Sequence, residues 1–149
     1  MLSALRGSYL QRYTRATLAF MTFISDRNVV FPVDQNMVFT DMRLNVGNHY
    51  NPLTGVFQAP KSGTYHFALT LANNNVWGTL YNAFIVAGDG NKVLGYVYQS
   101  DNWESWQTST VSVLPHLDAG VNVWIKCRAS PCSIAHTFHS YFFWVPGGR

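Results

Sequence analysis

Residues 49–67 read HYNPLTGVFQAPKSGTYHF, and aromatic residues and glycines recur along this stretch at regular intervals. Its four large aromatic residues are Tyr50, Phe57, Tyr65 and Phe67. Proline presets φ and glycine accepts a positive φ, so we expect tight turns at Thr54-Gly55 and at residues 60–63. The aromatic side chains are expected to point inward on successive strands. None of them is a nucleophile, so this stretch predicts a fold and not a catalytic site.

The rest of the chain carries strand signals and no convincing amphipathic helix. Residues 64–71 alternate apolar with polar or small side chains, which is the period of a strand. NAFIVA, GDGN and KVLGYVY (residues 82–98) predict a hairpin with a glycine-rich turn. The other expected strands are residues 16–25, 37–42, 109–114, 121–127 and 133–145, the last two forming a hairpin around a cysteine loop. Such short strands separated by turn residues are typical of a sandwich or barrel.

The final strand is apolar on both faces. On one face the pattern places Phe138, Phe142 and Trp144, and on the other it places Tyr141, Phe143 and Val145. A strand with one solvated face normally alternates apolar with polar residues. One face can fill the sandwich, and the other then needs a second partner. A subunit interface is the expected partner, and a loop that covers the sheet is the alternative.

Composition limits the classes of function. Charged residues make up 11% of the 149 residues, against about 25% in a typical soluble domain. An oligomer that hides one face accounts for so few charges. The net charge of +3 is spread along the chain, and only Arg6, Arg12 and Arg15 form a loose cluster. We therefore expect no nucleic-acid partner. No apolar run is long enough to span a membrane, so no membrane insertion is expected.

The chain is expected to form one domain over residues 16–145. Residues 1–15 are expected to form a leader, and residues 146–149 a tail. The leader contains Arg and Ser and no acid, a composition that also suits a mitochondrial transit peptide. No secretory signal is visible, so a secreted form would require this chain to begin after its signal.

The two cysteines, Cys127 and Cys132, flank the segment RASP. Two cysteines alone cannot complete a four-ligand zinc site. Residues that flank a hairpin tip lie within disulfide range, so we expect a bond between them. Two partly buried free thiols are the alternative.

Catalytic and metal-binding motifs are absent from the sequence. The five histidines and seven acids are dispersed, and none forms an obvious acid–base pair. The segment GDGNK (residues 88–92) is similar to a calcium loop, but it lacks the series of ligands and the closing glutamate, so a hairpin turn is favoured. The sequence therefore predicts that the protein is not an enzyme and assigns no cofactor.

Two loops have the composition of recognition surfaces. ANNNVWG (residues 72–78) and QSDNWESW (residues 99–106) place Trp beside amides and carboxylates. An indole ring stacks on the apolar face of a sugar while polar groups bind its hydroxyls. Similar loops also bind proteins, and tryptophans can instead plug the ends of a sandwich. The candidate ligand contacts are Asn73, Asn74, Asn75, Trp77, Asp101, Asn102, Trp103 and Glu104, with Arg128 as a contact for an anionic group such as sialic acid.

A set of spaced residues then resembles a known family signature: Phe39, Asn45, Tyr50, Phe57, Gly63, Tyr65 and Phe67. Their spacing resembles the signature of the complement C1q globular-head family. The signature ends in an aromatic residue where this chain has Leu69. The family also has an Asp after the glycine that corresponds to Gly120, where this chain has Val121. Any role of that missing carboxylate is therefore not carried over.

The resemblance implies a ten-stranded, all-β jelly-roll sandwich of the tumour-necrosis-factor type that assembles as a homotrimer. It implies that the second face of the last strand, with Tyr141, Phe143 and Val145, lies at the trimer interface. The chain has no collagen repeat, so it is most similar to head-only invertebrate lectins of innate immunity. The expected function is a secreted pattern-recognition lectin for microbial or host glycans. A receptor ligand or complement-like adaptor is the alternative. Calcium occurs in some family heads, but no ligand set for it is recognisable here.

Overall fold

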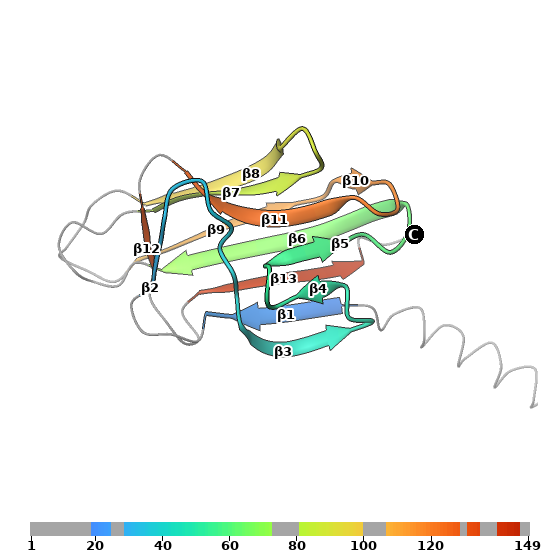
Figure 1. Ribbon diagram of the computed structural model, residues 1–149, viewed down its shortest axis with the longest axis horizontal. Coiled ribbons are helices and arrows are strands. Elements are labelled where there is room, and N and C mark those ends of the chain that lie inside the picture. Colours follow the sequence, from blue (N-terminus) through green and yellow to red (C-terminus); the bar gives the residue numbers. More distant parts are fainter. Residues whose placement is uncertain are drawn as a thin grey trace, which may run out of the picture.

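The computed structural model describes residues 19–24, 29–72, 81–99, 107–128, 131–134 and 140–146. These residues form strands and turns. Figure 1 shows the strands arranged in two layers, one containing β6, β13 and β1 and the other containing β11, β7 and β8. Strands within each layer pair antiparallel. The all-β sandwich expected from the sequence is confirmed.

The first layer is a six-stranded sheet in the order β10-β6-β13-β1-β3, with β9 also paired to β6. Its strands are β1 (Ala19–Phe23), β3 (Asp41–Val46), β6 (Gly63–Ala72), β9 (Thr108–Val113), β10 (His116–Leu117) and β13 (Tyr141–Pro146). Both β9 and β10 pair with β6 and are separated only by Leu114 and Pro115. They therefore act as one interrupted edge strand.

The second layer is a five-stranded sheet in the order β4-β5-β11-β7-β8. Its strands are β4 (Tyr50–Asn51), β5 (Val56–Gln58), β7 (Tyr81–Ala87), β8 (Lys92–Gln99) and β11 (Asn122–Cys127). A separate pair joins β2 (Val29–Phe31) to β12 (Cys132–Ile134). With β9 and β10 counted as one strand, each sheet has five strands, and these are the ten strands of the expected jelly roll.

The aromatic residues of the opening stretch fill the core between the sheets. Tyr50, Phe57, Tyr65 and Phe67 are each at most 3% exposed, and Phe39, which precedes the stretch, is fully buried beside them. The polar Asn45 of the signature has a structural role, because its Nδ2 donates to the carbonyl oxygen of Tyr50 at 2.8 Å. Leu69, which replaces the expected aromatic residue, is fully buried. The stretch therefore builds the sandwich, as predicted.

The two expected turns of that stretch differ in their glycines. Gly55 has φ +75°, and a Cβ on it would lie 3.1 Å from the carbonyl oxygen of Met37, so the turn requires glycine. Gly63 was expected in a turn that uses positive φ, and that expectation is wrong. It is absent from the positive-φ residues and is instead the first residue of β6, paired with Leu117.

One of the expected strands is wrong. Residues 37–42 were expected to form a strand, but β3 begins only at Asp41. Met37 and Phe39 are fully buried, so their apolar character reflects burial in an irregular segment. Its backbone N–H groups form individual hydrogen bonds with separate partners. The N–H of Met37 donates to the carbonyl oxygen of Ile125 at 2.8 Å, and the N–H of Phe39 donates to the Tyr50 hydroxyl at 3.1 Å. A segment bonded in this way needs no ladder of strand hydrogen bonds.

The expected hairpin of residues 121–127 with 133–145 is also wrong. β11 pairs with β5 and β7, whereas β13 pairs with β1 and β6 in the other sheet. β12, which lies between these two strands in the sequence, pairs with β2 and with neither of them. By contrast, β7 and β8 form the predicted hairpin, and GDGN is its turn, with φ +72° at Gly88.

Candidate functional site

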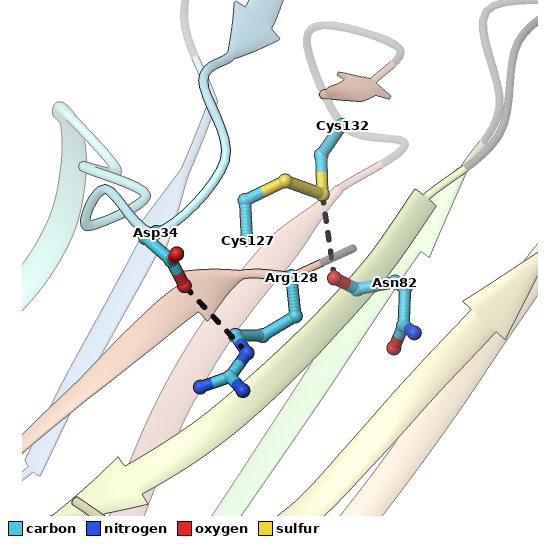
Figure 2. The surroundings of a disulfide bond; sticks show 5 residues. All are labelled: Asp34, Asn82, Cys127, Arg128 and Cys132. Carbon is cyan, nitrogen blue, oxygen red and sulfur yellow. Dashed lines mark hydrogen bonds and ion pairs between the residues drawn. A yellow bond between two sulfur atoms is a disulfide. The ribbon is translucent and has the colours of Figure 1, made fainter. Parts of the chain in front are cut away.

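The cysteine segment lies at one end of the sandwich, and the structure joins its two sulfurs. Cys127, the last residue of β11, is bonded to Cys132 of β12, and both side chains are fully buried. In Figure 2 the bond connects the ribbon of β11 to the short β12 strand. The Sγ atom of Cys132 also lies 3.5 Å from the backbone oxygen of Asn82 on β7. The disulfide therefore ties three elements together at what we call the disulfide end.

Arg128 follows the disulfide directly, and it is the predicted ligand contact that falls within the described residues. Its backbone N–H donates to the carbonyl oxygen of Asn82 at 2.7 Å. The guanidinium carbon lies 5.4 Å from the centroid of the Phe84 ring, within cation–π range. Nε lies 3.6 Å from Oδ1 of Asp34. Figure 2 shows its two terminal nitrogens turned away from Asp34. Arg128 is thus held in place by these contacts, and its side chain remains 43% exposed.

Asp34 and Phe84 were not identified from the sequence. Asp34 lies in a turn after β2, far along the chain from its partner, so no local pattern links the two residues. Phe84 was recognised only as part of the strand NAFIVA. Its place in the alternation, opposite to the buried Ala83 and Ile85, is the signal that would have placed it on the outer face of the sheet.

The eight predicted loop contacts lie outside the described residues: Asn73, Asn74, Asn75, Trp77, Asp101, Asn102, Trp103 and Glu104. The structure does describe the strands that flank these loops, and the ends of those strands are paired with one another. Tyr81 at the start of β7 pairs with Gln99 at the end of β8, and Ala72 at the end of β6 pairs with Thr108 of β9. The hydroxyl of Tyr81 donates to the carbonyl oxygen of Leu71 at 2.7 Å, which links the two sheets there.

These flanking residues lie at the disulfide end. Cys127 pairs with Ala83 on β7, only two residues from Tyr81. Figure 1 accordingly shows the tip of β6 and the start of β7 near β12. Both candidate loops therefore enter and leave the folded domain at the same end that carries Arg128.

The predicted interface residues lie on the outer face of the six-stranded sheet. Phe142 and Trp144 are buried in the core, whereas Tyr141, Phe143 and Val145 point the other way. Phe143 lies opposite Met21, and Tyr141 lies opposite Phe23, on the neighbouring strand β1. The Tyr141 and Phe143 rings stack with centroids 6.2 Å apart. We call this set of five outward residues, Met21, Phe23, Tyr141, Phe143 and Val145, the β13 face.

The other half of the same outer surface is polar. Across β6 and β9, Thr70 and Thr110 share a hydrogen bond of 2.7 Å. His66 Nε2 lies 2.6 Å from the Ser112 hydroxyl oxygen. The His66 ring also contacts Phe143, with centroids 6.0 Å apart. The surface therefore grades from aromatic on β1 and β13 to hydroxyl-bearing on β9.

Other chemistry in the described residues is sparse. No group of three or more His, Cys, Asp or Glu side chains there is arranged to hold a metal ion. No helix in the described part of the chain is long and apolar enough to cross a membrane. A groove of about 660 Å³ lies beside the β7–β8 turn, at the end opposite to the disulfide, with Leu94, Val113 and Leu117 in its lining.

Comparisons with known proteins agree on the fold. The family model described as the C1q domain matches residues 19–143. The globular domain of zebrafish complement 1qA protein superposes with a TM-score of 0.73 at 16% identity, covering 89% of this chain and 98% of that chain. Eiger TNF from S. frugiperda gives 0.65 at 13% identity, covering 88% and 92%. Murine APRIL at pH 5.0 gives 0.63 at 11% identity, covering 86% and 97%. At these identities the structural matches show a shared fold alone.

Proposed function

This chain belongs to the C1q domain family, and we propose that it is a secreted homotrimeric lectin that recognises glycans on microbial or host surfaces. It would act by binding and not by catalysis, in the manner of the head-only invertebrate members of the family. Acidic sugars such as sialic acid are the proposed preferred ligands, because a positioned arginine pairs well with a carboxylate.

The observation that supports this proposal best is that the strands flanking both candidate loops end at the disulfide end, where Arg128 lies. Arg128 lies beside Asn82, and both Trp- and Asn-containing loops join the sheets at this end. Residues 73–77, residues 101–104 and Arg128 would then form one site. Tryptophan rings would stack on a sugar ring, amides and carboxylates would bind its hydroxyls, and Arg128 would bind its acidic group.

Trimer formation through the β13 face would make such a site effective. The face joins aromatic side chains from β1 and β13 on the outer surface of the six-stranded sheet. Burying it against two other copies would remove this apolar area from water. Three weak sites on one trimer would gain about 10²–10⁴-fold in avidity against a repetitive glycan surface.

The disulfide supports an extracellular location, because such bonds persist in oxidising compartments and are rare in the cytosol. The family supports the same location. A secreted role also agrees with the loops, which suit recognition of other molecules.

The lectin proposal is tested with a glycan array and a bacterial-polysaccharide pull-down at physiological salt. The wild-type trimer should bind, and Trp103→Ala should bind less while keeping its assembly and melting temperature. A well-folded wild-type trimer that binds no glycan would sink the proposal. A Trp103→Ala variant that aggregates or melts much earlier would show that Trp103 belongs to the core and not to the site.

A protein-binding trimer, acting as a receptor ligand or complement-like adaptor, is the second candidate. It is favoured by two exposed tyrosines, Tyr96 and Tyr98, since exposed tyrosine is enriched among residues that dominate protein interfaces. Affinity capture from native body fluid or cells would favour this role if it gave one dominant protein and if free sugars did not compete with that protein.

A further inference from the structure

The outer face of the five-stranded sheet carries a row of side chains that the loop predictions did not include. Outward residues on β11, β7 and β8 fall into cross-strand rows, because Lys126 pairs with Phe84, and Phe84 pairs with Tyr96. The next row toward the disulfide end contains Arg128, Asn82 and Tyr98, since Asn82 pairs with Tyr98. We call the five residues Arg128, Asn82, Phe84, Tyr96 and Tyr98 the β8 face.

The two tyrosines of this face are open to solvent. Tyr96 is 61% exposed and Tyr98 is 57% exposed, although both belong to a regular strand. They are two residues apart on one face of β8, which is about 7 Å along a strand. The Tyr96 ring lies against Phe84, with centroids 5.8 Å apart, so its position is supported from one side. The supported Tyr96 ring and the exposed Tyr98 ring suit the apolar face and the hydroxyls of a sugar.

The charge of this region favours an anionic ligand. Asp34 Oδ1 lies 3.6 Å from Arg128 Nε and 3.9 Å from Lys126 Nζ, so one carboxylate is shared by two cations. These three residues leave one positive charge, two cations less one anion. The Lys126 side chain is only 18% exposed, whereas that of Arg128 is 43% exposed. Arg128 is therefore the cation that an incoming carboxylate would meet.

The position of Arg128 is fixed by neighbours on three sides. Phe84 lies beneath the guanidinium, Asp34 faces its Nε, and the disulfide holds the preceding residue. A guanidinium that is already ordered loses less entropy when it binds a carboxylate through two parallel hydrogen bonds. Two strand spacings, about 10 Å, separate β11 from β8. Arg128 and the tyrosines can therefore bind different parts of one short glycan.

We propose that the β8 face is a binding platform for acidic sugars, in which Arg128 binds the carboxylate and Tyr96 and Tyr98 bind the sugar ring and its neighbour. This inference rests on the proposed lectin function and adds a described, strand-borne surface to it. The β8 face lies on the opposite side of the sandwich from the β13 face, so a trimer formed through β13 leaves it accessible. It is also continuous with the disulfide end, because Tyr98 is followed by Gln99 and the predicted loop.

The test is an NMR or calorimetric titration of the full chain with sialyllactose, and with lactose as the neutral probe. Wild type should bind sialyllactose at least tenfold more tightly than lactose. Tyr96→Ala, Tyr98→Ala and Arg128→Gln should each weaken sialyllactose binding by about tenfold. Tyr98→Phe keeps the ring and removes the hydroxyl, so it distinguishes their contributions to binding. Arg128→Lys keeps the positive charge and removes the planar fork of the guanidinium. Leu53→Ala, at an 88% exposed site on another turn, is the matched control and should bind normally.

The outcomes separate this inference from the proposed function. Loss of binding in the three β8-face variants, with trimer and melting temperature unchanged, supports the platform. Wild-type binding that is unaffected by these variants but lost in Trp103→Ala overturns the platform and leaves the lectin function standing. Equal binding of lactose and sialyllactose overturns the assignment to acidic sugars. No binding of any glycan overturns both.

Discussion

Phe23 on β1 and Tyr141 on β13 lie side by side on the outer surface of the six-stranded sheet, with ring centroids 5.7 Å apart. The guanidinium carbon of Arg43 lies over the Phe23 ring, 5.3 Å from its centroid, and Arg43 pairs with Asp41 at 2.8 Å. The aromatic area of the β13 face is thus bordered by an ion pair. An apolar centre with a polar rim is the usual anatomy of a protein interface.

The first prediction concerns assembly. Phe143→Glu should convert the trimer to monomer, because a carboxylate would be buried at the interface without a partner, at a cost on the order of 3 kcal/mol per interface. Light scattering after size-exclusion chromatography measures the mass. Leu53→Glu makes a similar change at an exposed turn and should remain trimeric. A trimeric Phe143→Glu protein would place the interface elsewhere.

The second prediction concerns the disulfide. Cys127 and Cys132 are five positions apart, so the bond closes a short loop and should stabilise the fold by about 2 kcal/mol. The double Cys127→Ser, Cys132→Ser variant should lose that amount in urea unfolding and should also bind acidic glycan more weakly, because Arg128 is less firmly held. Reduced wild-type protein should behave in the same way. Unchanged glycan affinity in both proteins would show that glycan binding by Arg128 does not depend on the disulfide.

The third prediction concerns the contact between β8 of one sheet and β9 of the other sheet. A Cβ on Gly95 would lie 2.7 Å from Val113 Cγ1 and 2.9 Å from Val111 Cγ2. Gly95→Ala should therefore lower the free energy of unfolding by about 1–3 kcal/mol through overpacking.

Adding Val113→Ala should recover part of that loss, because it removes the methyl group nearest to the new Cβ. Gly90→Ala is the matched control, since a Cβ there meets no atom within 4 Å and no positive φ is required. Thermal or urea unfolding provides the measurement. If Gly95→Ala and Gly90→Ala unfold alike, the two strands are not in close contact.

The fourth prediction concerns alkaline pH. Burial raises the pKa of Tyr50 from 10.0 to about 12, with the hydrogen bond to Phe39 acting in the opposite direction. A raised pKa in the folded state means that folding favours the protonated phenol. Its stabilising contribution is complete below pH 10 and is lost as the pH rises toward 12. Unfolding experiments across this window should show falling stability.

Tyr50→Phe tests the assignment to that residue. The variant should lose about 1 kcal/mol at neutral pH because its hydrogen bonds to Phe39 are gone. Its stability should then depend less steeply on pH between 10 and 12. An equally steep loss in the variant would assign the effect to other buried tyrosines, such as Tyr81, whose pKa burial also raises.

The sequence pattern correctly predicted the strands whose residues alternate between a buried and an outward face. The alternation of Tyr65, Phe67 and Leu69 correctly indicated the inward face of β6, because a strand with one buried face must alternate. Residues 37–40 were mistaken for a strand because a buried irregular segment is as apolar as a strand. The hydrogen-bond partners of its backbone are Ile125 and Tyr50, and a local sequence pattern cannot predict such distant partners.

At the disulfide end, too, the sequence pattern could not predict contacts between distant segments. A bond between Cys127 and Cys132 was expected from a hairpin, yet their strands belong to different sheets. The bond forms because the fold places the two Cα atoms 5.9 Å apart although their strands are not paired. Similarly, Arg128 was selected for its charge, but the Asp34 and Phe84 contacts that position it come from distant segments. The sequence identified the residue type, and only the fold identified its neighbours.

Hydrogen–deuterium exchange of the trimer, with and without saturating sialyllactose, tests whether acidic sugars bind at the disulfide end. We expect protection in the last residues of β8, the first residues of β7 and the segment around Arg128. We expect no change at the groove beside the β7–β8 turn, where Leu94 and Leu117 lie. Protection confined to that groove, or no protection in a protein that remains folded and trimeric, would rule out a glycan site at the disulfide end.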